Sequence, residues 1–287
     1  MPEPDAHARP WRSVLYLPAS NAKALEKARG LAADAIIFDL EDAVAADQKA
    51  AARAALVGAL LAGGYGQRAK IVRINGLETE WGRADAAAFA TSQPDAILVP
   101  KVDRPADIDA VAALVPGTPI WAMMETPAGV LNAAAIAAHP RLQGMVMGTN
   151  DLLKDLGARF RPDRLALTGG LSLCVLAARA EGRIIVDGVY NAFKDEAGFE
   201  AECAQGRDMG FDGKTLIHPA QIEISNRAFA PSEEELDLAR RQIEAFEAAR
   251  AAGQGVAVVD GRIVENLHIV TARQTLARAG AIAALAL

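Results

Sequence analysis

Eight short apolar runs, separated by segments with helical character, constrain the fold of this 287-residue chain more than any other feature. Uninterrupted apolar runs of this kind are typical of parallel strands that are buried on both faces. Eight such strands alternating with helices predict an α/β fold, a (β/α)8 TIM-type barrel, with an open doubly wound sheet as the alternative. The runs lie at residues 12–17, 34–39, 70–74, 95–101, 118–124, 144–147, 183–188 and 211–218.

The chain continues well beyond the eighth run. Residues 231–252 read as a charged helix, residues 253–255 as a glycine hinge, residues 256–264 as one strand-like stretch and residues 266–283 as a closing helix. We therefore predict a flexible tail at 1–10, a barrel domain at 11–230 and a C-terminal helix and lid segment at 231–287. A barrel does not need this extension, so we expect it to cover an active site, its own or that of a neighbouring subunit.

Composition limits the classes of partner. Apolar residues make up 52% of the chain, charged residues 23%, and the net charge is −6, which is typical of a soluble enzyme and argues against a nucleic-acid surface. No apolar run reaches the roughly 18 residues that span a bilayer, so no membrane partner is expected. Two cysteines and a start without a basic, apolar leader predict a cytoplasmic protein.

Polar residues stand at or near the ends of the eight runs, and a closed barrel would bring all these ends to its usual active-site face. Glu125 and Asp151 end successive runs, and two carboxylates offer the hard oxygen ligands that Mg²⁺ prefers. Zinc has no support, because the four His and two Cys do not occur in ligand spacing. The alternative is that each acid only caps the following helix. The full set is Glu41, Asp42, Arg73, Lys101, Glu125, Asp151, Asp187, Lys214 and His218.

Arg73 interrupts an otherwise apolar run, where a guanidinium is costly to bury without an anionic partner. We expect it to hold a substrate carboxylate, flanked by Glu41 and Asp42; an internal ion pair with those acids is the alternative. Lys101 could form a Schiff base or simply be an ion-paired lysine. His218 is more readily explained as a structural residue.

Several motifs together resemble the citrate lyase beta-subunit-like family of the HpcH/HpaI aldolase superfamily, which includes malyl-CoA lyases and (3S)-malyl-CoA thioesterases. The resemblance extends from about residue 11 to 283. The motifs are RSVLYLP at 12–18, FDLEDAV at 38–44, VRING at 72–76, VPK at 99–101, METPAG at 124–129, GTND at 148–151 and KTLIHP at 214–219.

The resemblance implies a Mg²⁺-dependent enzyme that acts on a CoA thioester. It assigns the metal to Glu125 and Asp151, the carboxylate of the oxo-acid half to Arg73, and contacts with CoA to Lys27 and Arg12. It also implies a homo-oligomer, a trimer or hexamer, whose C-terminal segment covers the adjacent subunit and supplies a catalytic acid or base. Glu265 stands where the family has Asp, and the extra methylene moves the carboxylate by about 1 Å.

The expected reaction is carbon–carbon cleavage of a 3-hydroxyacyl-CoA such as malyl-CoA or citryl-CoA, with Arg73 and Glu265 as catalytic residues. Hydrolysis of the thioester is the first alternative, because admission of water to the same site changes the outcome. A metal-dependent aldolase acting on free 2-oxo acids and a carrier-dependent beta subunit of a lyase complex are the others.

Overall fold

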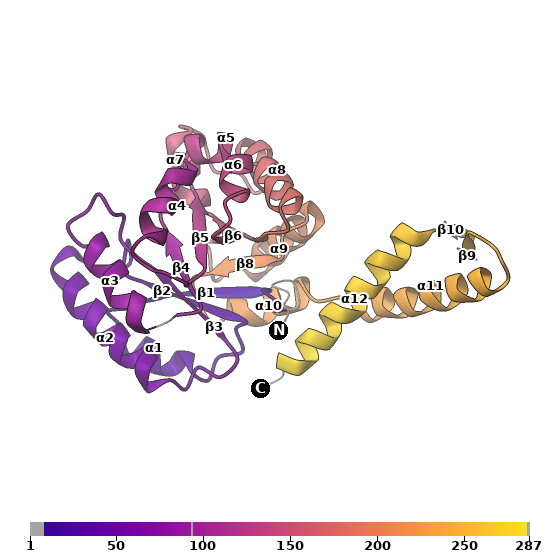
Figure 1. Cartoon of the computed structure of the whole chain (residues 1–287), viewed down its shortest axis with the longest axis horizontal. Helices are drawn as coiled ribbons and strands as arrows, with labels where there is room; N and C mark the ends of the chain where they lie inside the picture. The colour runs from indigo at the N-terminus through magenta and orange to yellow at the C-terminus, as the bar shows by residue number, and fades with distance from the viewer. Residues whose placement is uncertain (1–8, 93, 286–287) are drawn as a thin grey trace. The chain divides into compact units, whose positions relative to one another are not determined.

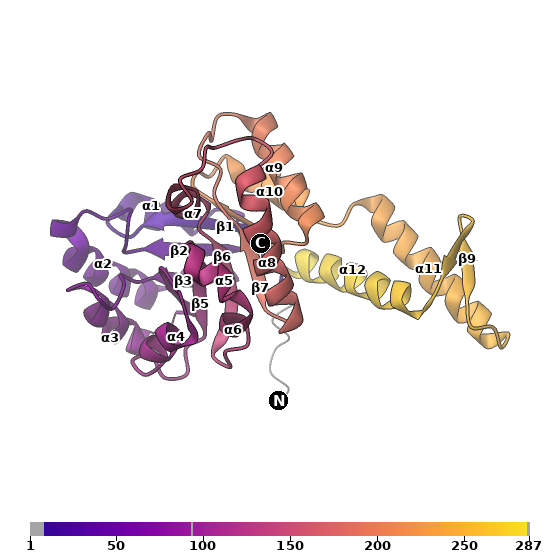
Figure 2. The same cartoon turned by 90° about the horizontal axis from the view of Figure 1, so that it is seen from above.

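The computed structural model describes residues 9–92 and 94–285. It divides into a unit at Trp11–Phe229 and a C-terminal unit that begins at Ala230. Figures 1 and 2 show the eight-stranded unit and the C-terminal helices, which we describe separately. The predicted flexible tail falls mostly on residues 1–8, outside the described residues.

The first unit is a closed barrel of eight parallel strands in the order β1 to β8, which confirms the TIM-type fold and excludes the open sheet. The barrel closes where β8 pairs with β1, Ser13 opposite Lys214. A Cβ at Gly213 would lie 1.8 Å from the Trp11 carbonyl oxygen, so this seam requires glycine. The strands are Ser13–Pro18, Ala35–Asp39, Ala69–Arg73, Ala96–Val99, Ile120–Met124, Leu142–Met147, Ile184–Asp187 and Gly213–Leu216.

Helices surround the strands (Figure 1). Their buried faces and the strands form one apolar core; in β2, β4, β5, β7 and β8 every residue is buried, as expected for strands covered on both faces. The helices are α1 Ala22–Ala28, α2 Lys49–Ala62 after a 3₁₀ turn at Ala46–Gln48, α3 Gly82–Ser92, α4 Pro105–Ala112, α5 Pro127–Leu131, α6 Ala133–Ala137, α7 Thr149–Asp155, α8 Leu165–Ala180, α9 Glu196–Met209 and α10 Gln221–Ala228.

Two details of this unit differ from the sequence-based expectation. The single helix expected at 128–138 is divided into α5 and α6 at Asn132, whose side-chain amide donates to the Asp103 carbonyl oxygen at 2.8 Å. This tertiary bond holds the side chain outside the helical pattern. Helix α10 was not predicted, because it is short and its sequence is mostly polar.

The C-terminal unit consists of α11 Glu233–Ala251, β9 Ala257–Val259, β10 Arg262–Val264 and α12 Asn266–Leu285. The expectation of one strand at 256–264 is wrong. Asp260 and Gly261 have φ of 49° and 72° and connect two antiparallel strands, the geometry of a tight hairpin turn that Asp-Gly favours. The chain runs out along α11, turns through this hairpin and returns along α12 (Figures 1 and 2). Val259, Val264 and Ile269 lie in its core.

Across residues 9–92 and 94–285, no helix has the length and apolar character needed to cross a membrane.

Candidate active site

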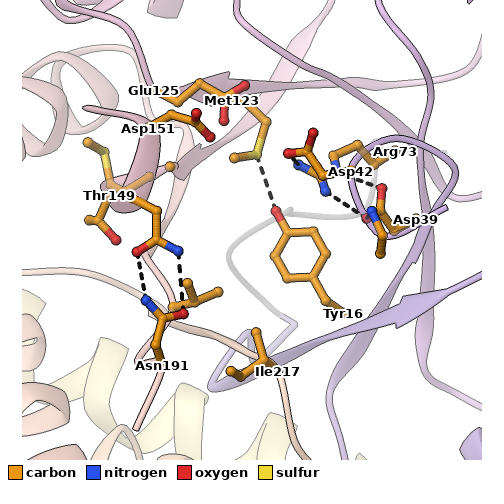
Figure 3. Close-up of a pocket in the computed structure, with 15 residues that line it drawn as sticks. Tyr16, Asp39, Asp42, Arg73, Met123, Glu125, Thr149, Asp151, Asn191 and Ile217 are labelled. Carbon is orange, nitrogen blue, oxygen red and sulfur yellow. Dashed lines mark hydrogen bonds and ion pairs between the residues drawn. The ribbon is translucent and has the colours of Figure 1, made fainter. Parts of the chain in front are cut away.

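A cavity of about 300 Å³ opens at the C-terminal ends of the barrel strands (Figure 3). Its lining comes from elements far apart in the sequence. Asp39 and Arg73 are the last residues of β2 and β3, and Glu125 directly follows β5. Tyr16 of β1 and Asp151 of α7 also line the cavity. This is the face that carries the active site in TIM barrels, as the strand-end argument predicted.

Glu125 is fixed by the backbone of the neighbouring loop. Its Oε1 accepts a hydrogen bond of 2.8 Å from the Lys101 N–H, and its side chain is buried. Lys101 has φ of 49°, a strained backbone conformation for a residue with a side chain, and such strain is typical of functional sites. Burial raises the pKa of Glu125, the Lys101 N–H and Arg73 lower it, and Asp151 raises it again.

Gly148 makes room for this carboxylate. A Cβ at position 148 would lie 2.3 Å from the Glu125 Cβ and 2.6 Å from Oε2. The turn from β6 into α7 therefore passes directly over Glu125, and the first turn of α7 brings Asp151 to the same cavity. Figure 3 shows the Glu125 and Asp151 carboxyl groups beside each other.

Within the described part of the chain, no group of three or more His, Cys, Asp or Glu side chains is arranged to hold a metal ion. Two neighbouring carboxylates still fit Mg²⁺, which usually takes one or two protein carboxylates and fills its remaining positions with water and substrate oxygens. Asp151 raises the pKa of Glu125, the effect expected when like charges share a site that a cation would relieve. The donor set therefore suits Mg²⁺ and not zinc.

Arg73 forms the internal ion pair that the sequence left as the alternative. Its Nε and Nη2 donate to the two Asp39 oxygens at 2.7 and 2.6 Å, and Nη1 lies 2.8 Å from Glu41 and 3.6 Å from Asp42. Sequence reasoning missed Asp39. Arg73 also lies over the Tyr16 ring at 5.1 Å and lines the cavity. Burial lowers its pKa, but Tyr16, Asp39 and Glu41 outweigh burial and raise it.

The backbone at Glu41 is fixed by a buried lysine, Lys49, which sequence reasoning also missed. Lys49 Nζ donates to the Leu40 and Glu41 carbonyl oxygens at 2.9 and 2.7 Å and to Asn75 Oδ1 at 2.7 Å. Burial raises the pKa of Glu41 to about 7, although Arg73 opposes the change. A carboxyl group that titrates near neutral pH beside a cavity is suited to proton transfer.

Three predicted site residues lie elsewhere. Arg12 precedes β1, at the opposite end of the barrel, and its side chain forms two hydrogen bonds of 2.9 and 2.8 Å with Asp34; its contact with CoA stays a prediction. Lys27 is exposed on α1 and does not line the cavity. Glu265 is exposed and belongs to the C-terminal unit, so its catalytic role stays a prediction.

Three other residues of the predicted set have structural partners instead. Lys214 is fully buried, and its Nζ lies 2.9 Å from Asp187 and 2.7 Å from Glu202. Burial would raise the pKa of Asp187, but Lys214 and Arg164 outweigh it and lower that pKa. His218 is exposed and stacks on the Phe193 ring at 4.6 Å.

Residues 12–219 match the model of the HpcH/HpaI aldolase/citrate lyase family. A (3S)-malyl-CoA thioesterase of Cereibacter sphaeroides is 72% identical, over 96% of this chain and 97% of the relative. A citrate lyase subunit beta of Escherichia coli is 37% identical, over 94% of both chains. The crystal structure of CitE from Mycobacterium tuberculosis with magnesium, acetoacetate and coenzyme A aligns with a TM-score of 0.80 at 32% identity and covers 95% of this chain and 99% of that one.

Proposed function

Because the chain belongs to the HpcH/HpaI aldolase/citrate lyase family, we propose that it is a magnesium-dependent enzyme that hydrolyses a 3-hydroxyacyl-CoA thioester such as (3S)-malyl-CoA. The observation that carries this proposal is the 72% identity to a (3S)-malyl-CoA thioesterase along nearly the full length of both chains. Carbon–carbon cleavage, the reaction expected first from the sequence, is the second candidate. The carboxylate pair and Arg73 in one cavity favour it, because that arrangement also suits an oxo acid.

Glu125 and Asp151 would hold the cation, which supplies a Lewis acid and a template for the oxygens of the acid half. Magnesium is present in the CitE structure of Mycobacterium tuberculosis, and this supports the same cofactor here. The Lys101 N–H keeps Glu125 in one orientation, so the carboxylate does not have to reorganise when a ligand arrives.

Arg73 would stabilise negative charge that develops on the substrate. Its guanidinium is preorganised by Asp39 and stacked on Tyr16, so its position is fixed before the substrate binds. Glu41, whose raised pKa is about 7 and whose carboxyl group lies 2.8 Å from Arg73, would serve as a proton donor or acceptor beside this group. Lys27, exposed on α1, is available for the phosphates of CoA.

The proposal includes a homo-oligomer, a trimer or hexamer, in which the C-terminal unit covers the site of an adjacent copy and brings Glu265 to it as acid or base. Support comes from three apolar side chains of that unit. Val258, Ile263 and Leu267 are 65%, 62% and 61% exposed, and the first two are cross-strand partners on one face of the hairpin. Exposed apolar clusters of this kind are typical of interaction surfaces.

The test is a mass-spectrometric assay of purified protein with malyl-CoA and citryl-CoA, with and without Mg²⁺. We expect free malate and CoA, formed only with Mg²⁺. Glyoxylate and acetyl-CoA as the products would establish the lyase instead. Turnover of free oxo acids that CoA does not inhibit would support the aldolase alternative, and no turnover of any free CoA thioester would support a carrier-dependent subunit.

A further inference from the structure

A second cavity of about 180 Å³ adjoins the candidate active site, and we propose that it receives the substituent on the keto carbon of a 2-oxo acid, or on the corresponding carbon of its hydroxyacyl thioester. The inference rests on the proposed function and names the substrate class of that site. Thr149, Asn150, Val189 and Asn191 line both cavities, so the two adjoin each other. We call the second cavity the side pocket.

The walls of the side pocket are largely apolar. Its apolar side chains include Leu153 of α7, Leu167 of α8 and Phe160 of the loop between these helices. A cavity of about 150 Å³ with such a lining accepts a molecule the size of benzene, so the side pocket has room for a chain of several carbons. The polar end of the same molecule would stay in the candidate active site, where Glu125 and Asp151 would hold the cation that binds it.

Arg164 is a buried cation in the lining of the side pocket. Its Nε donates to Gln205 at 2.7 Å and its Nη1 to both oxygens of Asp187 at 2.7 Å, but Nη2 is buried and has no hydrogen-bond partner among the described residues. Buried guanidinium N–H groups are almost always paired, because an unmade hydrogen bond costs the full desolvation of the donor. A ligand that places an oxygen acceptor at this nitrogen would complete the set.

The charges around Arg164 select a neutral acceptor. Lys214 lies 2.9 Å from Asp187 and 2.7 Å from Glu202, and Glu202 also lines the side pocket. Two cations and two carboxylates balance in this buried cluster. A substrate carboxylate would add a third negative charge beside Asp187 and Glu202, whereas a ketone or similar neutral oxygen would satisfy Nη2 without that repulsion.

The boundary between the cavities is made by two amides. Asn191 Nδ2 donates to Asn150 Oδ1 at 2.8 Å, and Asn150 Nδ2 donates to Asn191 Oδ1 at 3.4 Å, as the paired dashed lines beside Asn191 mark in Figure 3. Both residues are exposed, and exposed hydrogen bonds of this kind exchange readily with water. A substituent can therefore pass this boundary without disrupting the buried cluster.

Isothermal titration with Mg²⁺ and four acids tests the proposal. Glyoxylate has no substituent on its keto carbon, and 2-oxohexanoate has an apolar one. The substituent of 2,5-dioxohexanoate contains a neutral ketone, and that of 2-oxoglutarate carries a carboxylate in its place. We expect 2,5-dioxohexanoate to bind about tenfold or more tightly than glyoxylate and 2-oxoglutarate, with 2-oxohexanoate between them.

Two variants and one control test whether the binding preference arises in the side pocket. Ala192 is exposed and lines only the side pocket, so Ala192→Leu adds bulk there. This variant should lower the preference for 2,5-dioxohexanoate over glyoxylate about tenfold. Ala197→Leu makes the same change on the exposed surface of α9, away from both cavities, and should keep the preference. Arg164→Lys should remove the preference for 2,5-dioxohexanoate over 2-oxohexanoate, with circular dichroism to confirm the fold.

The outcomes separate this inference from the function on which it rests. If glyoxylate binds with Mg²⁺ and all longer acids bind more weakly, the side pocket is not a substituent site, although the proposed function stands. Tighter binding of 2-oxoglutarate than of 2,5-dioxohexanoate would overturn the neutral acceptor. If none of the four acids binds, this inference fails, and the assay with malyl-CoA decides the proposed function separately.

Discussion

A single backbone N–H, that of Lys101, orients the Glu125 carboxylate. That hydrogen bond occupies Oε1 and leaves Oε2 for a cation. Removing the negative charge should thus abolish cation binding without disturbing the loop, because an amide side chain can keep the same hydrogen bond through its oxygen.

We therefore predict that Glu125→Gln lowers kcat/KM by about 100-fold or more and weakens Mg²⁺ binding, as measured by steady-state kinetics and calorimetry. Glu80→Gln, at an exposed position outside the cavity, is the control and should match the wild type. Full activity of Glu125→Gln in EDTA would contradict the metal role of Glu125.

Glu41 should make stability depend on pH. The unfolded chain releases this proton near the ordinary pKa of 4.5, whereas the folded chain holds it until about 7. Because the pKa of this acid is raised in the folded state, protonated Glu41 stabilises the folded state. This stabilisation is complete below about pH 4.5 and is lost as the pH rises to about 7. Glu41→Gln, which resembles the neutral acid, avoids that loss.

The wild type should therefore lose stability between pH 5 and pH 8, whereas Glu41→Gln should not. The free energy of unfolding of Glu41→Gln minus that of the wild type should rise by roughly 2–3 kcal/mol over this range. Urea unfolding in EDTA at both pH values measures the difference, since a bound cation would lower the pKa of Glu41. A constant difference between variant and wild type would show that Glu41 is ionised throughout.

Arg73 illustrates what can be predicted for single residues. A charged residue inside an apolar run is visible in the sequence, so its need for an anion could be stated. Its partner could not be identified, because Asp39 faces Arg73 only through the register of β2 with β3, which pairs these two positions directly. Lys49 was missed for a similar reason: in the sequence it is an ordinary polar residue at the start of a helix.

At the level of elements, the turn from β6 into α7 matters most for the site, because it must pass within contact distance of Glu125. We predict that Gly148→Ala displaces Glu125 and weakens Mg²⁺ binding about tenfold or more. Gly169→Ala is the matched control. Gly169 lies in α8, and a Cβ added there would meet nothing within 4 Å, so alanine should stabilise the protein by about 1 kcal/mol and leave Mg²⁺ binding unchanged.

The end of β7 and the start of β8 are joined by the buried cluster of Asp187, Lys214, Arg164 and Glu202. Lys214→Met leaves two carboxylates short of a partner and should lower the free energy of unfolding by about 3–5 kcal/mol in urea titrations. The double variant Lys214→Met with Glu202→Leu should recover part of the loss. Equal stability of Lys214→Met and the wild type would mean that the cluster is not an ion-pair network.

The strand pattern made the barrel predictable, because eight apolar runs with intervening helices fit few other folds. The sequence could not distinguish strand-end residues that face the cavity from those that pair within the wall: Asp187 ends an apolar run much as Glu125 follows one, yet only Glu125 lines the cavity. That difference depends on α8 and α9, since Glu202 lies within α9 and Arg164 directly precedes α8.

At the scale of the whole molecule, the division of the chain into two units near Ala230 allows the C-terminal unit to be removed and its role in activity tested. A chain that ends at Phe229 should keep the barrel's far-ultraviolet circular dichroism and cooperative unfolding, yet lose nearly all turnover, because it lacks Glu265 and the segment that we propose as a lid. A cut after Gly253 is less suitable, since α11 would keep Ile243 and Phe246 without the core they pack against. Wild-type turnover of the shortened chain would exclude the lid. Light scattering of both proteins reports whether the C-terminal unit is needed for a trimer or hexamer.

The amide pair of Asn150 and Asn191 has one further consequence. Neither side chain carries a charge or titrates, so the passage between the two cavities should be indifferent to ionic strength and acidity, even though ionised groups line the candidate active site beside it. Entry of a long substrate would then be governed by its shape, while its anchoring at the carboxylate pair stays sensitive to electrolytes.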